Sequence, residues 1–146
     1  MIRLAETDED RRRCFPVMVQ LRPLLTQQSF VDQAGRQSAN GGYRLAMLED
    51  GGRVRAVAGF RVTENLFSGR HVYVDDLVTD ESVRSNGLGG QLFDWLVEHA
   101  KSEGCVRFEL DSGVQRGGAH RFYFQKRMHI SSYRFRMELG LDESAR

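Results

Sequence analysis

The sequence predicts one α/β domain over residues 1–146, built on a mixed sheet that starts antiparallel and becomes parallel. Two observations lead to this prediction. Between residues 43 and 79, β-rich segments follow one another across tight turns, as in an antiparallel meander. Farther along, a strand, a glycine-rich turn, an amphipathic helix and another strand occur in that order, and a crossover of this length joins parallel strands.

The first 40 residues predict a short strand and two helices. Apolar and polar side chains alternate over residues 1–5, as in a strand. Thr7 and the three acidic residues after it indicate the start of a helix, because a hydroxyl caps free N–H groups and the helix dipole favours negative charge. Pro16 should kink this helix and Pro23 should end it. A second helix, polar overall, is expected from residue 24 to about residue 39.

The antiparallel meander consists of three expected strands, over residues 43–48, 54–62 and 71–79. The Asp-Gly-Gly sequence at residues 50–52 predicts a hairpin between the first two strands, because these residues tolerate positive φ. A second turn at residues 67–70 leads into the third strand.

The second half alternates helices and strands. Residues 88–101 carry apolar side chains at helical spacing, so this helix should pack on the sheet. A strand is expected over residues 105–110, a short helix over 117–126 and a last strand over 128–139.

Composition excludes several classes of protein. A net charge of +1 predicts neither a nucleic-acid surface nor an acidic tail. No apolar run is long enough to span a membrane, and the charged residues after Leu4 do not fit a signal peptide, so the prediction is a cytoplasmic protein. Cys14 and Cys105 are therefore expected to be reduced. No Cys/His group has zinc-ligand spacing, so no metal cofactor is expected.

The glycine-rich turn is the strongest functional signal in the sequence. It follows the apolar strand, opens an amphipathic helix and begins with the basic residue Arg84. Free N–H groups and the positive end of a helix dipole meet at such a point, which favours binding of a phosphate group. Glycines also let a ligand approach the backbone closely.

Two common phosphate motifs do not fit this turn. The dinucleotide fingerprint requires a third glycine where this chain has Leu92, and the P-loop requires a Gly-Lys-Ser/Thr sequence. What remains at residues 84–89 is R-x-x-G-x-G. This resembles the pyrophosphate-binding motif of the GNAT superfamily of acyl-CoA-dependent N-acyltransferases.

Other segments resemble the same family. The strand with the acidic pair Asp75 and Asp76 is similar to the fourth strand of that family, and residues 119–123 resemble its A-x-x-F-Y helix. Two positions depart from the family pattern. Residues 127–128 are Arg-Met where relatives usually have Gly-Phe, and residues 111–112 are Asp-Ser where many relatives have an Asn near the cofactor amide.

The resemblance implies acetyl-CoA as cosubstrate and a V-shaped cleft between the fourth and fifth strands. In that cleft the pantetheine arm would bind as an added strand along Leu77, Val78 and Thr79, and a backbone N–H near Leu77 would polarise the thioester carbonyl. The pyrophosphate would be held at the glycine turn. Its expected ligands are Arg84, Ser85, Asn86, Gly87, Leu88, Gly89 and Gly90.

The resemblance also implies a general base and a general acid. An ammonium group must lose a proton before it can attack, and a carboxylate can remove it. Asp75 is the first choice for this base, with Asp76 and Glu64 as alternatives. Strand alternation places Asp75 and Asp76 on opposite faces unless a bulge intervenes, with Leu77 on the face of Asp75. Tyr123 corresponds to the tyrosine that protonates the leaving thiolate.

The predicted function is transfer of an acetyl group from acetyl-CoA to a primary amine, by direct attack in a ternary complex. The acceptor is a small molecule or a peptide, and its identity and the acyl-chain preference stay open. The alternative is a non-catalytic module of the same fold that binds acyl-CoA or a partner protein. Dimers are common in the family, so a homodimer is a further expectation, while nucleic-acid and membrane partners are not expected.

Overall fold

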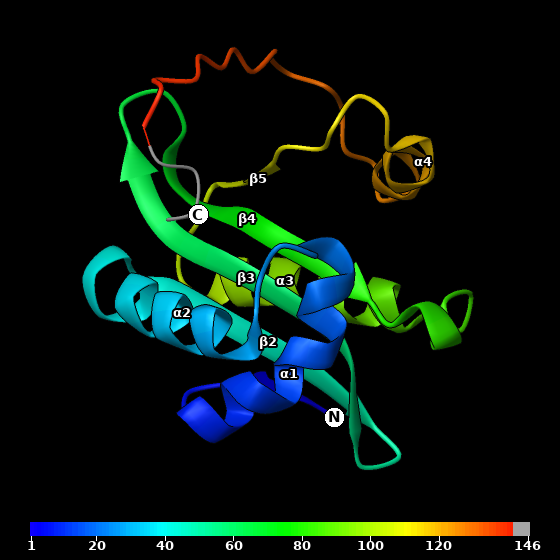
Figure 1. Ribbon diagram of the computed structural model, residues 1–146. Coiled ribbons are helices and arrows are strands. Elements are labelled where there is room, and N and C mark those ends of the chain that lie inside the picture. The colour runs from blue at the N-terminus through cyan, green and yellow to red at the C-terminus, as the bar shows by residue number, and fades with distance from the viewer. Residues whose placement is uncertain (142–146) are drawn as a thin grey trace. The chain divides into compact units, whose positions relative to one another are not determined.

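The structure is a computed structural model that describes residues 1–141 (Figure 1). The chain forms two compact units, Met1–Leu110 and a second unit that begins at Asp111.

The first unit is built on one five-stranded sheet in the order β1-β2-β3-β4-β5. Strands β1 to β4 pair antiparallel in sequence order, and β5 pairs parallel to β4, so the predicted mixed sheet is confirmed. The strands are β1 (Ile2–Leu4), β2 (Tyr43–Asp50), β3 (Arg53–Asn65), β4 (Gly69–Thr79) and β5 (Arg107–Leu110).

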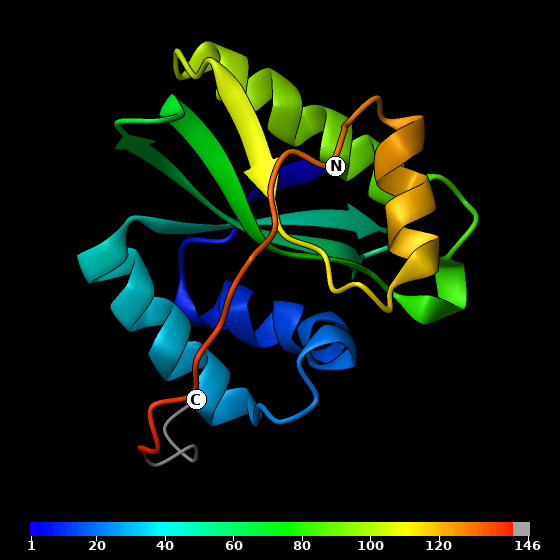
Figure 2. The same cartoon turned by 90° about the horizontal axis from the view of Figure 1, so that it is seen from above.

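Helices cover both faces of this sheet (Figure 2). One hydrophobic cluster joins α1 and α2 to one face, and a second cluster joins α3 to the other. A short 3-10 helix, η1, leads from β4 toward α3. These elements are α1 (Asp8–Leu21), α2 (Gln27–Gly41), η1 (Glu81–Val83) and α3 (Leu88–Ser102).

The starts of α1 and α2 follow from their capping residues. The Thr7 hydroxyl accepts a hydrogen bond from the Asp10 N–H, as predicted, and α1 runs through Pro16 to end before Pro23. Helix α2 starts later than expected, because Thr26 and Ser29 form a capping box at its N-terminus.

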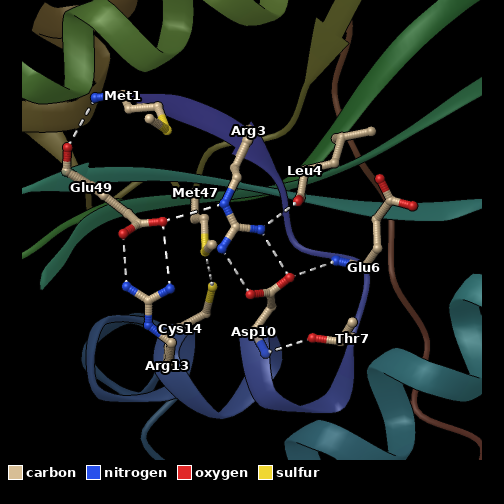
Figure 3. A network of polar contacts seen from close by, with 10 residues as sticks. All are labelled: Met1, Arg3, Leu4, Glu6, Thr7, Asp10, Arg13, Cys14, Met47 and Glu49. Atoms are coloured by element: carbon tan, nitrogen blue, oxygen red, sulfur yellow. Dashed lines mark hydrogen bonds and ion pairs between the residues drawn. The ribbon is translucent and has the colours of Figure 1, made fainter. Parts of the chain in front are cut away.

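An ion-pair network ties the first strand to α1 and β2 (Figure 3). Arg3 binds both carboxylate oxygens of Asp10, at 3.0 and 2.9 Å. The Arg3 Nε also lies 3.3 Å from Glu49 in β2, and Arg13 in α1 reaches the same carboxylate at 2.8 Å. The network therefore joins the first two elements of the chain to β2, which is distant from them in sequence.

The second unit contains a loop, helix α4 (Gly117–Gln125) and the residues that follow it to residue 141. The prediction of a last strand over residues 128–139 is wrong for this structure, which assigns no strand there. The alternating pattern is present in the sequence. A strand also needs an adjacent strand whose backbone N–H and C=O groups form hydrogen bonds with its own. Across residues 1–141, every helix is too short or too polar to cross a lipid bilayer.

Candidate active site

Strand β4 separates from β5 partway along its length. The parallel ladder joins His71 to Arg107 at one end and Val74 to Leu110 at the other, and β5 stops there. Residues 76–79 of β4 still pair with β3, but within the first unit no strand lies along the other edge of β4 after Val74. The backbone groups on that edge are therefore available to an extended ligand.

A β-bulge interrupts β4 at the acidic pair. Phe60 of β3 lies opposite Val74, whereas Gly59 lies opposite Asp76, so Asp75 is an extra residue without a partner in the ladder. An extra residue shifts the alternation of side chains by one position.

The bulge places both carboxylates on the face of the sheet that α1 and α2 cover. Asp75 binds Arg61, and Asp76 binds Tyr43 of the α1–α2 hydrophobic cluster. Opposite faces are expected only without a bulge, and the bulge named as the exception is present, so the two carboxylates share one face. Leu77 packs with the α3 cluster, on the other face of the sheet. The prediction that Leu77 shares the face of Asp75 is therefore wrong.

The side-chain carboxylate of Asp75 is held by Arg61. The Arg61 Nε and Nη2 donate to its two carboxylate oxygens at 2.9 and 2.8 Å. The same guanidinium lies over the Tyr73 ring, 5.2 Å from the ring centre. This bidentate pair fixes both the carboxylate and the arginine plane.

Asp76 is held by a buried phenol and a second arginine. The Tyr43 hydroxyl donates to Asp76 Oδ2 at 2.8 Å, and Arg22 Nε donates to Oδ1 at 2.9 Å. Arg22 also donates to the backbone carbonyl of Asp75 at 2.9 Å, so the residue after α1 clamps the bulge. Burial, reinforced by the neighbouring Asp76 charge, raises the pKa of Tyr43 well above its ordinary value of 10.0.

Gly59 makes room for this arrangement. A Cβ atom on Gly59 would lie 1.8 Å from the Tyr43 hydroxyl oxygen and 2.6 Å from Asp76 Oδ2. Any side chain at residue 59 would therefore occupy the place of the Tyr43–Asp76 hydrogen bond. The bond can form only because residue 59 is glycine.

Glu64, the third candidate base, lies elsewhere. It is exposed near the end of β3, opposite Arg70, and five residues along the strand from Gly59. At roughly 3.3 Å per residue, this separation is about 16 Å. The structure thus brings Asp75 and Asp76 together and keeps Glu64 apart from them.

The glycine turn connects β4 to α3 as predicted. Ser85 and Gly87 both have left-handed backbone conformations, with φ of 79° and 78°. Gly87 caps α3, and no side chain hydrogen-bonds the first turn of the helix. The N–H groups of Leu88, Gly89 and Gly90 therefore have no intrahelical acceptor, as in other helix starts that bind anions.

Two contacts position this turn against the end of β4. Arg84 Nε donates to the Thr79 carbonyl at 3.4 Å, and the Arg84 side chain is exposed. A Cβ atom on Gly89 would lie 2.6 Å from the Thr79 hydroxyl oxygen, so α3 approaches β4 closely only because residue 89 is glycine. The open edge of β4 thus leads directly into the turn.

Tyr123 lies on α4 in the second unit. It is half-buried, and its ring meets the Phe122 ring edge-on at 5.5 Å. Burial raises the pKa of the Tyr123 phenol above 10.0, against the opposing effect of Arg116. The hydroxyl therefore stays protonated at neutral pH, as a proton donor must.

Sequence reasoning missed three residues that hold the acidic pair: Arg22, Tyr43 and Arg61. No local signal could have found them. A bulge between Leu48 and Glu49 shifts the β2–β3 register by one residue, so that Tyr43 lies opposite Arg61 and not opposite Phe60, the partner that the hairpin at residues 50–52 alone would give it. Arg22 reaches Asp76 across 54 residues of sequence.

Comparison with known proteins gives consistent results. The model of the acetyltransferase (GNAT) family matches residues 4–129. An uncharacterized N-acetyltransferase, YhdJ of Bacillus subtilis, is 33% identical over 129 residues, which are 88% of this chain and 91% of that protein. The aminoalkylphosphonate N-acetyltransferase of Salmonella typhimurium is 29% identical over 133 residues, covering 88% and 85% of the two chains.

Solved structures share the fold. The crystal structure of glucosamine-6-phosphate N-acetyltransferase from Arabidopsis thaliana aligns with a TM-score of 0.75 at 22% identity, covering 95% of this chain and 97% of that one. A transcriptional regulator from Bacillus halodurans aligns with a TM-score of 0.81 at 23% identity, covering 95% and 99%.

Proposed function

The chain belongs to the acetyltransferase (GNAT) family and is an acyltransferase that acts on amines, and we propose that it moves an acetyl group from acetyl-CoA to a small-molecule primary amine. The observation that carries the proposal is the open edge of β4 at residues 75–79, which leads into an uncapped, glycine-lined helix start. These two features fit an extended thiol ester with a pyrophosphate at its far end.

In this proposal, acetyl-CoA binds to both features at once. Its pantetheine arm lies along Leu77, Val78 and Thr79 as an added strand, and an N–H near Leu77 stabilises negative charge on the thioester oxygen. The pyrophosphate accepts hydrogen bonds from the turn at residues 84–90, with Arg84 adding a charge-assisted contact.

The amine then attacks the thioester carbonyl directly. Its nitrogen forms a bond to the carbonyl carbon, the carbon–sulfur bond breaks, and Tyr123 donates its phenolic proton to the departing thiolate. The proton that the nitrogen loses as the amide forms then restores the phenol. Neither cysteine is suited to act as a nucleophile instead. Cys14 is buried, and burial raises its pKa to about 12, which suppresses the thiolate.

The acidic pair supplies the base in this proposal. Both carboxylates are engaged by arginine, so we propose that the pair accepts the amine proton through a water molecule rather than by direct contact. Asp75 and Asp76 lie on the same face and share Arg22 through the carbonyl of one and the carboxylate of the other.

The names of two relatives guide the choice of acceptor. One is named for an aminoalkylphosphonate and the other for glucosamine 6-phosphate. Both compounds are small amines that carry an anionic phosphorus group. Arg22 and Arg61, half-exposed beside the acidic pair, offer positive charge to such a group.

A binding measurement and an activity measurement test the proposal together. Calorimetry with acetyl-CoA should show binding to the wild-type chain and to Gly41→Ala, a matched control with open space around residue 41. Binding should be lost in Gly89→Val, whose side chain would collide with Thr79. Tight binding by Gly89→Val would refute the assignment of the turn.

Release of free thiol from acetyl-CoA over a panel of amines is the second measurement. The panel includes aminoalkylphosphonates, amino-sugar phosphates, polyamines and amino acids. Thiol release with at least one small amine is expected. Binding of acetyl-CoA without thiol release for any of these amines would favour the alternative, a non-catalytic acyl-CoA-binding module.

A further inference from the structure

The two carboxylates of the acidic pair differ in how firmly they are held. Asp76 accepts a hydrogen bond at 2.8 Å from the hydroxyl of Tyr43, a core residue that is 5% exposed. A ligand cannot replace this partner without opening the core, even where it draws away the exposed Arg22. Asp75 depends instead on Arg61, whose side chain is 40% exposed. A ligand from solvent can therefore take the partner of Asp75 but not that of Asp76.

The backbone of Asp75 is fixed separately from its side chain. Residue 75 is the extra residue of the bulge, and Arg22 donates a hydrogen bond to its carbonyl oxygen at 2.9 Å. The Arg61 guanidinium binds the carboxylate, at 2.9 and 2.8 Å. If Arg61 binds another anion, the Asp75 side chain can turn about its own bonds to another rotamer while the bulge stays in place.

Arg61 can exchange this carboxylate for a phosphoryl group in the same place. Its guanidinium lies over the Tyr73 ring, 5.2 Å from the ring centre, and this contact does not depend on Asp75. A guanidinium binds two oxygens of a carboxylate or of a phosphoryl group with the same pair of N–H groups. A phosphoryl group carries more negative charge than a carboxylate at neutral pH, so it competes well for the arginine.

We propose that the acceptor amine carries a phosphonate or phosphate monoester group, and that this group takes Arg61 from Asp75 and so frees Asp75 to act as the base. This exchange, which rests on the proposed function, makes the base available only when an acceptor with that group is bound. A carboxylate bound to a guanidinium resists protonation, whereas a carboxylate beside other anions accepts a proton readily. After the exchange, Asp75 lies near two anions, Asp76 and the phosphoryl group.

The proton then has a complete path. It passes from the ammonium group of the acceptor through a water molecule to the Asp75 carboxylate, and the neutral amine attacks the thioester carbonyl. Residues 75 and 77 are about 7 Å apart along β4, so the acceptor needs only a short chain between its amine and its phosphoryl group. When the product leaves, Asp75 gives the proton to solvent and binds Arg61 again.

A separate anion tests the exchange in the wild-type chain. Thiol release from acetyl-CoA is measured with ethylamine, which has no phosphoryl group, while methylphosphonate is added at constant ionic strength. We expect kcat for ethylamine to rise roughly tenfold and to saturate, whereas aminoethylphosphonate and ethanolamine phosphate should reach the higher kcat without any addition. Release with ethylamine that methylphosphonate does not raise would overturn the exchange and leave the proposed function standing. No release with any of these amines would overturn both.

Arg61→Gln separates release of Asp75 from mere support of it. Without Arg61 the carboxylate is free from the start, so kcat with ethylamine should exceed that of the wild type and ignore methylphosphonate, while KM for aminoethylphosphonate rises roughly tenfold. Arg53→Gln, which removes an exposed arginine at the other end of β3, is the control and should behave as the wild type. A lower kcat with ethylamine in folded Arg61→Gln would overturn the proposal. The methylphosphonate result in the wild-type chain stands even if Arg61→Gln fails to fold.

Discussion

Arg127 occupies a backbone conformation that suits glycine. Its φ is 66°, at the position just beyond the C-terminus of α4. The Arg127 N–H donates to the Phe124 carbonyl and the Met128 N–H donates to the Tyr123 carbonyl, which is the Schellman pattern of helix ends. Glycine usually fills this position. The helix that carries Tyr123 is therefore closed by a strained arginine.

Replacing this arginine by glycine should stabilise the chain. A left-handed conformation costs a residue with a Cβ roughly 1–2 kcal/mol, which glycine would not pay. Glycine is also more flexible in the unfolded chain, and this offsets part of the stabilisation. For Arg127→Gly we expect about 0.5–1 kcal/mol more free energy of unfolding and a Tm about 2–3 °C higher. Arg127→Ala keeps the Cβ and should bring no gain. Equal Tm values for the two variants would show that the conformation is not strained.

Loss of the Tyr123 hydroxyl should slow chemistry without weakening cosubstrate binding. Tyr123→Phe keeps the ring and its packing against Phe122 but removes the proton for the thiolate. General acids of this kind contribute roughly 10²–10⁴-fold, so kcat should fall by at least 10²-fold at pH 7 while the Kd for acetyl-CoA changes little. In the wild-type chain the raised pKa predicts that activity persists to pH values above 10 before this proton is lost. Unchanged turnover in Tyr123→Phe would remove the hydroxyl from the mechanism.

Among the elements, the bulged ladder between β3 and β4 depends on Gly59. Gly59→Ala places a methyl group where the Tyr43 hydroxyl and Asp76 now meet. Either the hydrogen bond breaks or β3 moves, and we expect a loss of about 2 kcal/mol in the free energy of unfolding, together with lower activity. Denaturant unfolding with a thiol-release assay measures both.

Gly35→Ala is the matched control for this change. Residue 35 lies inside α2, where the nearest atom to a new Cβ is Arg11 Nη1 at 4.0 Å. Alanine there should stabilise the helix by about 0.5–1 kcal/mol. If Gly59→Ala is as stable as Gly35→Ala, the close packing around Gly59 is not a constraint.

The elements also show how far the sequence determines this fold and site. Hairpin turns, helix caps and the apolar period of α3 are local signals, so the sheet order and the glycine turn could be predicted. The bulge at Asp75 could not be located, because one extra residue in a ladder depends on the facing strand and leaves no mark in its own sequence. The segment over residues 128–139 has the alternating pattern of a strand. That pattern alone does not show which strand edge, if any, the segment would pair with.

In the first unit, arginine supplies the positive charge in most of the ion pairs between elements. Of the 21 basic residues, only Lys101 and Lys126 are lysines, which leaves 19 arginines. Arg44 and Arg70 both bind Glu103, the residue that follows α3, and Arg55 binds Asp80 beyond β4. Each pair joins elements that are distant in sequence. Because a guanidinium can bind more than one acceptor, single arginines connect several elements at once.

These arginines should make the stability of the molecule sensitive to acid. The hydrogen bond from Arg3 lowers the pKa of Asp10 from 3.8 to about 2. The pKa values of Glu49 and Glu103 are also lowered, in each case chiefly by hydrogen bonds from arginine, and that of Asp80 is lowered chiefly by a backbone N–H of Ser82. A carboxyl whose pKa is lower in the folded chain stabilises it above the unfolded pKa, and this stabilisation is lost as the pH falls through the folded pKa.

The free energy of unfolding should therefore decline steadily as the pH falls from about 5 to about 2. For Asp10, the lowered pKa corresponds to a contribution of roughly 2 kcal/mol to the free energy of unfolding. Because the Arg3 side chain is 40% exposed and solvent screens the pair, we reduce this contribution to about 1 kcal/mol. Asp10→Asn should thus unfold about 1 kcal/mol more easily than the wild-type chain at pH 7, and the difference should vanish near pH 2. Asp8→Asn, which removes an exposed carboxylate in the same turn, is the control and should lie within about 0.5 kcal/mol of the wild type. Urea unfolding of the three chains at pH 7, 5, 4, 3 and 2 measures the effect, and a difference for Asp10→Asn that stays constant with pH would show that its charge is not what stabilises the network.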